Sequence, residues 1–271
     1  MGRAKDIIVK VIPANIANEF VKKHHYSGKV VANSSLHFGA FLDGKLHGVM
    51  SYGSPLDKRK VLPLVQPSLW NEMLELNRMA FDDYLPANSE SRCIAISIRL
   101  IKRNAPHVKW ILSFSDGTQC GDGTIYRASG FNLTGIKENS QLFELQSGEK
   151  VHKMNFETTR PTPLQTKLRK QTGNISGSVN KLMSELGAKP LKGYQLRYIY
   201  LIDKTCKITV PILPFSKIDE LGAGMYKGKK VSLQERRQQA QEVLPVARLA
   251  PSQEEGFDST PALKSSDDGL R

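Results

Sequence analysis

The amino-acid sequence predicts an α/β fold in which a mixed central sheet is flanked by helices. Apolar residues alternate between helix spacing and strand spacing along the first 136 residues. Asp43-Gly44 separates two strand-like runs and favours a two-residue hairpin, because both turn positions need positive φ. The continuous apolar run at 108–115 is typical of a strand buried on both faces.

The predicted order is strand, helix, three strands, helix, strand and helix. The predicted bounds are 6–12, 14–24, 36–42, 46–52, 72–81, 89–104, 108–115 and a short helix that carries Tyr126. A weak alternation indicates the first strand. Apolar residues spaced three or four apart face the core from the two long helices, namely Ile16, Phe20, Val21, Ile94, Ile98 and Ile101.

Two domains are predicted. Residues 1–215 form the catalytic domain, whose segment 147–192 is a basic helical elaboration with helices at 164–171 and 175–186. Further strands are predicted at 131–136, 142–146 and 194–202. Residues 216–271 are rich in Gly, Gln, Ser and acids and predict a disordered, flexible low-complexity tail with one helix near 233–243.

Charge points to a polyanionic partner. The chain carries a net charge of +13 with a pI near 9.6. The predicted tail holds nine basic and nine acidic residues, so the whole excess belongs to the catalytic domain. Cations laid on phosphates release condensed counterions, which favours nucleic acid as the partner.

Other classes fit the sequence less well. No apolar run approaches the roughly 18 to 20 residues that cross a bilayer, and no signal-peptide core is present, so we expect no membrane partner and a cytoplasmic location. Three widely spaced cysteines predict reduced thiols. The six histidines form no helical His-x-x-x-His pair, so no metal site is predicted. The oligomeric state stays open.

The basic block between Ser147 and Tyr200 is the segment expected to contact phosphate. It contains ten Lys and Arg residues against three acids. The residues predicted to bind DNA are Lys153, Arg160, Lys167, Arg169, Lys170 and Lys181.

Asp116 and Tyr126 are the first two candidates for catalysis. Asp116 ends the buried strand, and open α/β sheets place their clefts at carboxyl strand ends. There a carboxylate can accept a proton from an attacking amine, and a phenol can donate one to a leaving group. The alternatives are a turn residue for Asp116 and a packing residue for Tyr126.

His25, Tyr26 and Arg78 are the other candidates. His25-Tyr26 lies where the first helix ends, and a stackable ring there suits a nucleobase. A histidine in that region also complements the helix dipole. Arg78 lies among apolar neighbours in a predicted strand, so it either pairs with Glu75 or binds an anion in the cleft.

Together these motifs resemble the Mom family of phage DNA-modification proteins, a divergent branch of the GNAT superfamily. The resemblance covers roughly residues 6–202 and rests on His-His-Tyr-Ser-Gly, Glu-Leu-Asn-Arg-Met-Ala, Ser-Phe-Ser-Asp-Gly, Gly-Thr-Ile-Tyr-Arg-Ala-Ser-Gly-Phe and Arg-Tyr-Ile-Tyr. It implies a GNAT-like sheet and conversion of adenine in double-stranded DNA to N6-(carbamoylmethyl)adenine, which protects phage DNA from host restriction. It also implies catalytic roles for His25, Tyr26, Arg78, Asp116 and Tyr126.

The donor is less defined than the acceptor. The resemblance implies acetyl-CoA or a related acyl donor, whose pyrophosphate GNAT proteins usually hold at a Gly-rich turn before a helix. The corresponding turn here has no glycine and offers Ser89, Ser91 and Arg92 instead, while Glu90 repels phosphate. A carbamoylmethyl group attaches through a CH2 carbon, so a further rearrangement or another donor is needed, and a metal ion such as iron stays open.

Two alternatives remain at this point. The chain could be a GNAT N-acyltransferase that acts on a protein or a small amine, with the same roles for Asp116 and Tyr126. It could also be a non-catalytic DNA-binding protein that uses the core as a scaffold.

Overall fold

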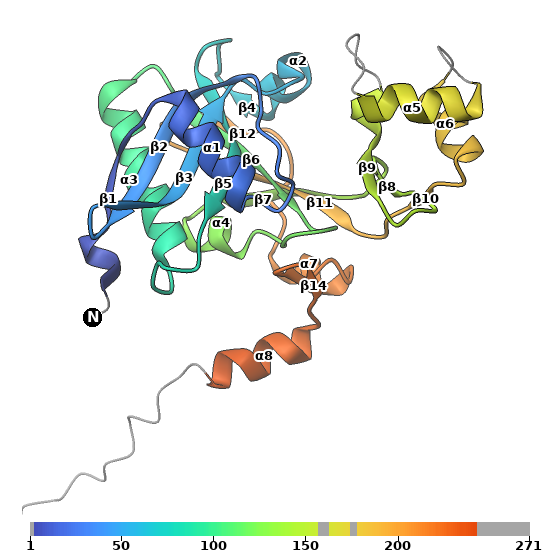
Figure 1. Ribbon diagram of the computed structural model, residues 1–271. Coiled ribbons are helices and arrows are strands. Elements are labelled where there is room, and N and C mark those ends of the chain that lie inside the picture. Colours follow the sequence, from blue (N-terminus) through green and yellow to red (C-terminus); the bar gives the residue numbers. More distant parts are fainter. Residues whose placement is uncertain (1–2, 157–162, 174–177, 243–271) are drawn as a thin grey trace, which may run out of the picture. The chain divides into compact units, whose positions relative to one another are not determined.

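A seven-stranded mixed sheet organises the computed structural model, which describes residues 3–156, 163–173 and 178–242 (Figure 1). The strands lie in the order β1-β2-β3-β5-β6-β11-β7. Their bounds are β1 Ile8–Val11, β2 Ser34–Leu42, β3 Lys45–Gly53, β5 Met73–Phe81, β6 Trp110–Asp116, β7 Asn132–Glu138 and β11 Tyr194–Leu201. The β5–β6 pair is parallel and the other neighbours are antiparallel, which confirms the predicted mixed sheet.

The β2–β3 hairpin forms at the predicted turn. Asp43 has φ of 51° and Gly44 has φ of 74°, as a type I′ turn requires at both central positions. Pairing of Leu42 with Lys45 follows directly from this two-residue loop.

Helices cover both faces of the sheet. Along β3, Val49 packs in one apolar cluster and Met50 in another, as expected for side chains that alternate across a strand. Helix α1 (Ala14–His24), with the bounds predicted, covers the Val49 face and contacts β2, β3 and β5 (Figure 1). Helices α3 (Ser89–Asn104) and α4 (Thr124–Ala128) cover the Met50 face.

Strands β5 and β6 are paired over only part of their length. The parallel register runs from Met73 opposite Trp110 to Leu76 opposite Ser113. Beyond that point β5 continues beside β3, and β6 continues beside β11 to Asp116. The later residues of these two strands therefore have no recorded pairing with each other.

An insertion with its own small core lies between β7 and β11. Its elements are β8 (Leu142–Glu144), β9 (Lys150–His152), η3 (Lys153–Phe156), α5 (Pro163–Thr172), α6 (Val179–Glu185) and β10 (Lys189–Pro190). Its buried apolar residues are Leu145, Val151, Phe156, Leu168, Leu182 and Met183. The predicted helix at 164–171 is present, and α6 matches the later part of the one at 175–186, whose first residues lie outside the described part of the chain.

Short elements complete the unit that ends at Leu233. They are η1 (Arg3–Asp6), α2 (Lys58–Val61), η2 (Leu62–Leu64), β4 (Val65–Gln66), β12 (Lys207–Ile208), α7 (Ser216–Glu220), β13 (Met225–Tyr226) and β14 (Lys229–Lys230). Strands β4 and β12 pair with each other, as do β13 and β14. Helix α8 (Leu233–Glu242) matches the predicted helix and belongs almost entirely to the second unit, which starts at Gln234.

The predicted start of the tail at Ser216 needs correction. Ile218, Ala223 and Met225 are all buried, and the first two belong to the main apolar cluster. The main-chain N–H of Asp122 also donates to the carbonyl oxygen of Met225 over 3.0 Å. These few apolar residues stand among Gly and Lys, so composition alone conceals them. Residues 243–271 of the predicted tail lie outside the described residues.

Candidate active site

A hydrogen bond joins two of the predicted catalytic residues. The hydroxyl of Tyr26 donates to Oδ2 of Asp116 over 2.8 Å, although the two residues are 90 positions apart in the sequence. Tyr26 follows the end of α1, and Asp116 is the last residue of β6. Burial and the negative charge of Asp116 both raise the pKa of Tyr26, so this phenol keeps its proton.

Asp116 also makes hydrogen bonds within its own turn, in addition to the one with Tyr26. Its Oδ1 accepts hydrogen bonds from the main-chain N–H groups of Thr118 and Gln119 over 2.9 and 3.2 Å. This is the turn role weighed as the alternative for Asp116. Because the two roles use different oxygens, the turn fixes the carboxylate while Oδ2 faces Tyr26.

His25 is neutral in this environment. Burial lowers its pKa from 6.5 to about 4, the positive charge of Arg78 adds to the effect, and Asp116 opposes it. Nδ1 accepts the main-chain N–H of Ser27 over 3.1 Å, so the neutral ring carries its proton on Nε2. The rings of His25 and Tyr26 have centroids 4.4 Å apart, so His25 also helps to position Tyr26.

Arg78 is held by main-chain carbonyl groups. Its Nε donates to the carbonyl oxygen of Lys29 and its Nη1 to that of Asn77, each over 2.9 Å. No ion pair with Glu75 is recorded in the described part of the chain, and Nη2 has no recorded acceptor there. The positive charge of Arg78 nonetheless acts on His25, Tyr26 and Glu75. This arrangement leaves Arg78 suited to an anion.

Tyr126 lies deeper than the other four candidates. It is only 6% exposed, and its ring packs against Phe131 and Tyr198 with centroid distances of 5.4 and 5.3 Å. Burial raises the pKa of Tyr126 to about 12, although a hydrogen bond with the Ser113 hydroxyl opposes this. Tyr126 has no recorded contact with Asp116 among the described residues. Tyr126 therefore has the packing role that was considered as its alternative.

Two residues that were not predicted as functional connect Tyr126 to the others. Glu75 and Cys120 both act electrostatically on Tyr126. The pKa of Cys120 is raised chiefly by burial and further by the negative charge of Asp116. Burial raises the pKa of Glu75 to about 7, and Arg78 opposes this rise. No hydrogen bond or ion pair of Glu75 is recorded in the described chain. The sequence signal for Glu75 was a carboxyl group between apolar neighbours on a predicted strand, where Glu75 was considered only as a partner for Arg78.

The loop from Asp116 to α4 is fixed by a buried carboxylate. Asp122 is 1% exposed, and it accepts hydrogen bonds from the Thr124 hydroxyl over 2.9 Å and the Met225 N–H over 3.1 Å. Gly123 follows with φ of 83°, and a Cβ there would lie 2.4 Å from the Tyr198 ring. The backbone therefore needs glycine at this position.

The residues predicted to bind a CoA pyrophosphate use their side chains in hydrogen bonds within the chain. Ser89 is buried and its hydroxyl donates to the carbonyl oxygen of Pro86, while the Ser91 hydroxyl donates to that of Asn88. Arg92 donates from Nη2 to the carbonyl oxygen of Lys5 over 3.3 Å. Its Nε is buried with no recorded partner. We assign no donor contact to these residues.

No group of three or more His, Cys, Asp or Glu side chains that could hold a metal ion is found within the described residues. We therefore assign no metal ligands. In the same part of the chain, no helix has the length and apolar character needed to span a membrane.

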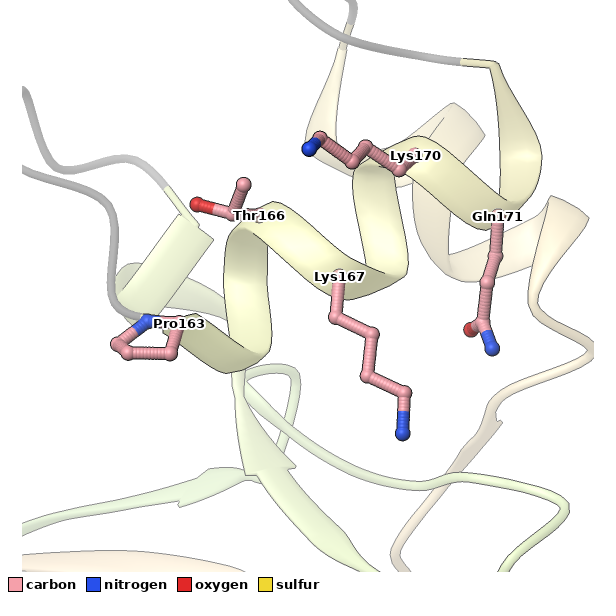
Figure 2. Close-up of a pocket in the computed structure, with 5 residues that line it drawn as sticks. All are labelled: Pro163, Thr166, Lys167, Lys170 and Gln171. Atoms are coloured by element: carbon pink, nitrogen blue, oxygen red, sulfur yellow. The ribbon is translucent and has the colours of Figure 1, made fainter.

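The predicted DNA-binding residues lie in the insertion, apart from these catalytic candidates in the sequence. Lys167 and Lys170 are exposed on α5 and line an open depression of about 810 Å³ with Pro163, Thr166 and Gln171. Figure 2 shows Lys167 and Gln171 extending to the same side of α5. This exposed polar side is suited to a charged partner.

The other members of that set differ in their environments. Arg169 is partly buried and donates to the carbonyl oxygen of Phe156 over 3.0 Å, so it stabilises the insertion. Lys181 is exposed and lies 3.8 Å from Glu185. Lys153 is partly exposed in η3, and Arg160 lies outside the described residues.

Comparison with known proteins gives a family match over most of the chain. The model of the Mom protein family matches residues 6–217. The methylcarbamoylase Mom of Escherichia phage Mu is 36% identical over 154 residues, which cover 56% of this chain. The aligned stretch spans 63% of the Mu protein, less than two thirds of its length.

Solved structures give weaker matches. A probable acetyltransferase from Staphylococcus epidermidis matches with a TM-score of 0.40 and 10% identity, covering 72% of this chain and 99% of the other. A GNAT family acetyltransferase from Elizabethkingia anophelis with acetyl-CoA bound matches with a TM-score of 0.38 and 12% identity, covering 72% and 98%. Both TM-scores are below 0.5.

Proposed function

This chain belongs to the Mom protein family, and from this membership we propose that it is an enzyme that modifies DNA. The proposed reaction converts adenine in double-stranded DNA to N6-(carbamoylmethyl)adenine and thereby protects phage DNA from host restriction, in the cytoplasm of the host cell. The name of the Mu relative, methylcarbamoylase, supports the transferred group. The net charge of +13 supports DNA as the substrate.

The observation that carries the proposal is the hydrogen bond from Tyr26 to Asp116. It brings together residues from two of the motifs that resemble the family. Arg78 acts electrostatically on Tyr26, and Asp116 acts on His25. A half-exposed aromatic ring beside a fixed carboxylate is suited to a nucleobase that has left its stack.

The chemistry needs a proton acceptor, because the N6 amino group is conjugated with the adenine ring and is a poor nucleophile. When N6 forms its new bond to carbon, one N–H proton must leave, and we assign its acceptance to Asp116. Tyr26 keeps its proton and holds Oδ2 of Asp116 in place. As the N6–C bond forms, the CH2 carbon of the donor must release the group it carried. Tyr126 is the proposed proton donor to that departing group, and Arg78 stabilises the negative charge that develops on it.

The donor is proposed only as a class, an acyl-CoA type of molecule. Ser89 and Ser91 use their hydroxyls within the turn, so no step is derived through the CoA group. A carbamoylmethyl product is joined to N6 through a CH2 carbon, and this linkage requires more than simple acyl transfer.

The test is expression of the chain in bacteria, followed by digestion of the DNA to nucleosides and mass spectrometry. We expect a deoxyadenosine in which one hydrogen is replaced by CH2CONH2, and we expect its loss in the Asp116→Asn variant. Acylation of a protein or small amine with unmodified DNA would support the N-acyltransferase alternative. DNA binding that Asp116→Asn leaves intact, without a product in either protein, would support a non-catalytic DNA-binding protein.

A further inference from the structure

An exposed apolar tip lies between β4 and β5. We use the name "tip" for residues 67–72, in which Leu69 is 70% exposed and Trp70 is 50% exposed. Single exposed apolar residues are common on protein surfaces, but two adjacent large ones at the end of a loop are a usual feature of binding sites.

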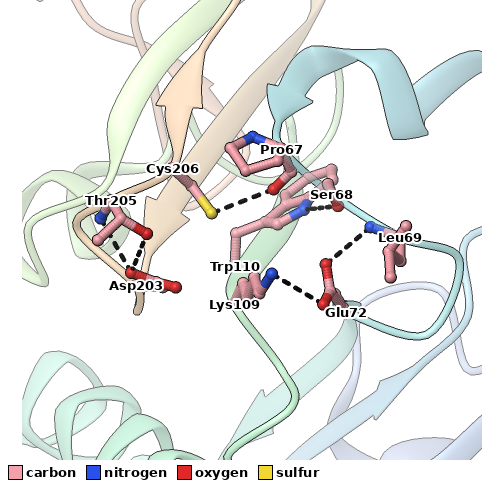
Figure 3. A network of polar contacts seen from close by, with 9 residues as sticks. All are labelled: Pro67, Ser68, Leu69, Glu72, Lys109, Trp110, Asp203, Thr205 and Cys206. Atoms are coloured by element: carbon pink, nitrogen blue, oxygen red, sulfur yellow. Dashed lines mark hydrogen bonds and ion pairs between the residues drawn. The ribbon is translucent and has the colours of Figure 1, made fainter.

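The tip is held rigidly from three sides (Figure 3). Nε1 of Trp110 donates to the Ser68 hydroxyl over 2.7 Å, and Sγ of Cys206 donates to the carbonyl oxygen of Pro67 over 3.3 Å. Glu72 accepts the Leu69 N–H over 2.7 Å and forms an ion pair with Lys109 over 2.8 Å. Exposure of the apolar pair is thus built into the structure, and little ordering is needed when it binds.

One lysine lies against the tip, and another lines the groove beside it. Nζ of Lys58, which is only 8% exposed, lies 4.8 Å from the centre of the Trp70 ring, and the exposed residue Arg59 follows it on α2. Beside the tip is an open groove of about 790 Å³ lined by Gln66, Pro67, Ser68, Leu69, Thr205, Lys207, Ile208 and Thr209. In the described chain, no ion pair is recorded for Lys58, Arg59 or Lys207.

Strand β6 connects the tip to the candidate active site. Trp110 at the start of β6 holds Ser68, and Asp116 at its end holds Tyr26. The pairing of β6 with β11 is regular throughout, so these two even-numbered residues lie on the same face of the sheet. Six residues at about 3.3 Å each separate them by about 20 Å. This distance is about six base-pair rises along a duplex.

We propose that the tip is a second DNA contact, in which Leu69 and Trp70 enter the minor groove as an apolar wedge while the exposed residues Arg59 and Lys207 contact the flanking phosphates. The inference rests on the proposed function, since it takes DNA as the substrate. Apolar side chains that enter the minor groove kink the duplex and loosen its stacking. A wedge bound at this distance from the candidate active site holds a bent duplex in place beside that site.

The charges favour DNA over a protein partner. The cores of protein interfaces are depleted in lysine, whereas here Lys58 lies over the Trp70 ring and Lys207 lines the groove beside Leu69. Phosphates on both sides of a minor groove match this arrangement of an apolar centre and a cationic rim.

The experiment measures the affinity of the full-length protein for a labelled duplex with one adenine target, and the emission of its tryptophans. The test variant is L69A/W70A. The control is I8A, which removes a side chain that is 64% exposed on β1, the edge strand of the main sheet. Thermal unfolding of each variant checks the fold. The chain has two tryptophans, and Trp110 is buried. A change in emission on DNA binding therefore reports Trp70.

We expect L69A/W70A to weaken duplex binding about tenfold or more, consistent with loss of one stacked or inserted aromatic, while I8A binds normally. We also expect DNA to quench the emission of the unmodified protein. Unchanged affinity together with unchanged emission would overturn the inference, and so would a loss of self-association in L69A/W70A without a change in DNA binding. Nucleoside analysis of the same samples separates the two proposals: tip-dependent binding without modified adenine contradicts only the proposed reaction.

Discussion

At the scale of single residues, the candidate site depends on which groups hold protons. Tyr26 and Tyr126 both have raised pKa values and stay protonated at neutral pH. His25 is neutral because its pKa is lowered to about 4. Asp116 and Glu75 are therefore the groups in this cluster best suited to accept a proton.

The Tyr26–Asp116 pair gives the first prediction. Asp116→Asn removes the proposed proton acceptor, so product formation should fall by about 10²-fold to 10⁴-fold. Tyr26→Phe removes the hydroxyl that holds Oδ2 and should also lower the rate. If the two residues act as one unit, the double variant will be little worse than Asp116→Asn alone. Rates of adenine modification in purified DNA test this, and fully additive losses would contradict a shared role.

Glu75 gives a prediction about pH. Its pKa is raised from 4.5 to about 7, chiefly by burial, so the carboxyl becomes ionised as the pH rises through about 7. If the ionised form assists proton removal, the reaction rate will rise across that pH range, and Glu75→Gln will flatten the pH–rate profile.

The raised pKa of Glu75 also affects stability. A carboxyl group whose pKa is raised on folding contributes most to stability below its pKa in the unfolded chain, and this contribution is lost as the pH rises towards 7. Between pH 5 and pH 8, the melting temperature of the Glu75→Gln variant should therefore fall less than that of the unmodified protein.

At the scale of elements, the sequence was most informative where local chemistry determines the structure. The Asp43-Gly44 turn, the bounds of α1 and the bounds of α3 follow from positive φ, helix spacing and apolar faces. The pairing of β5 with β6 over only four positions depends on tertiary contacts and has no local signal. For the same reason the sequence placed Tyr26 and Asp116 in one site but did not predict the bond between them.

Helix α5 gives a prediction about salt. The exposed residues Lys167 and Lys170 line its open side, whereas Arg169 holds Phe156 and should be left intact. Replacing both lysines with glutamine should reduce the slope of log affinity against log salt by about 2 if each contacts one phosphate. The charge-matched control replaces Lys102 and Arg103 in the last turn of α3. An unchanged slope in the α5 variant would move the DNA surface elsewhere.

At the scale of the whole molecule, the chain separates into a unit that ends at Leu233 and a unit that starts at Gln234. The sequence predicted this division about 18 residues too early, because composition reports average polarity rather than the position of a few buried side chains. Ile218 and Ala223 complete the main core, and the main-chain N–H of Met225 donates to Asp122 in the loop that follows Asp116.

Truncation tests this division. Removing residues 234–271 leaves every residue of the main apolar cluster in place, so the melting temperature should stay within a few degrees of that of the full chain. Removing residues 216–271 also deletes Ile218 and Met225, and loss of a buried side chain of this size costs about 2–5 kcal/mol. It also removes the Met225 N–H that donates to Asp122, so adenine modification should fall together with stability. Equal stability of the two truncated proteins would show that residues 216–233 add nothing to the core, and it would restore the boundary at 215.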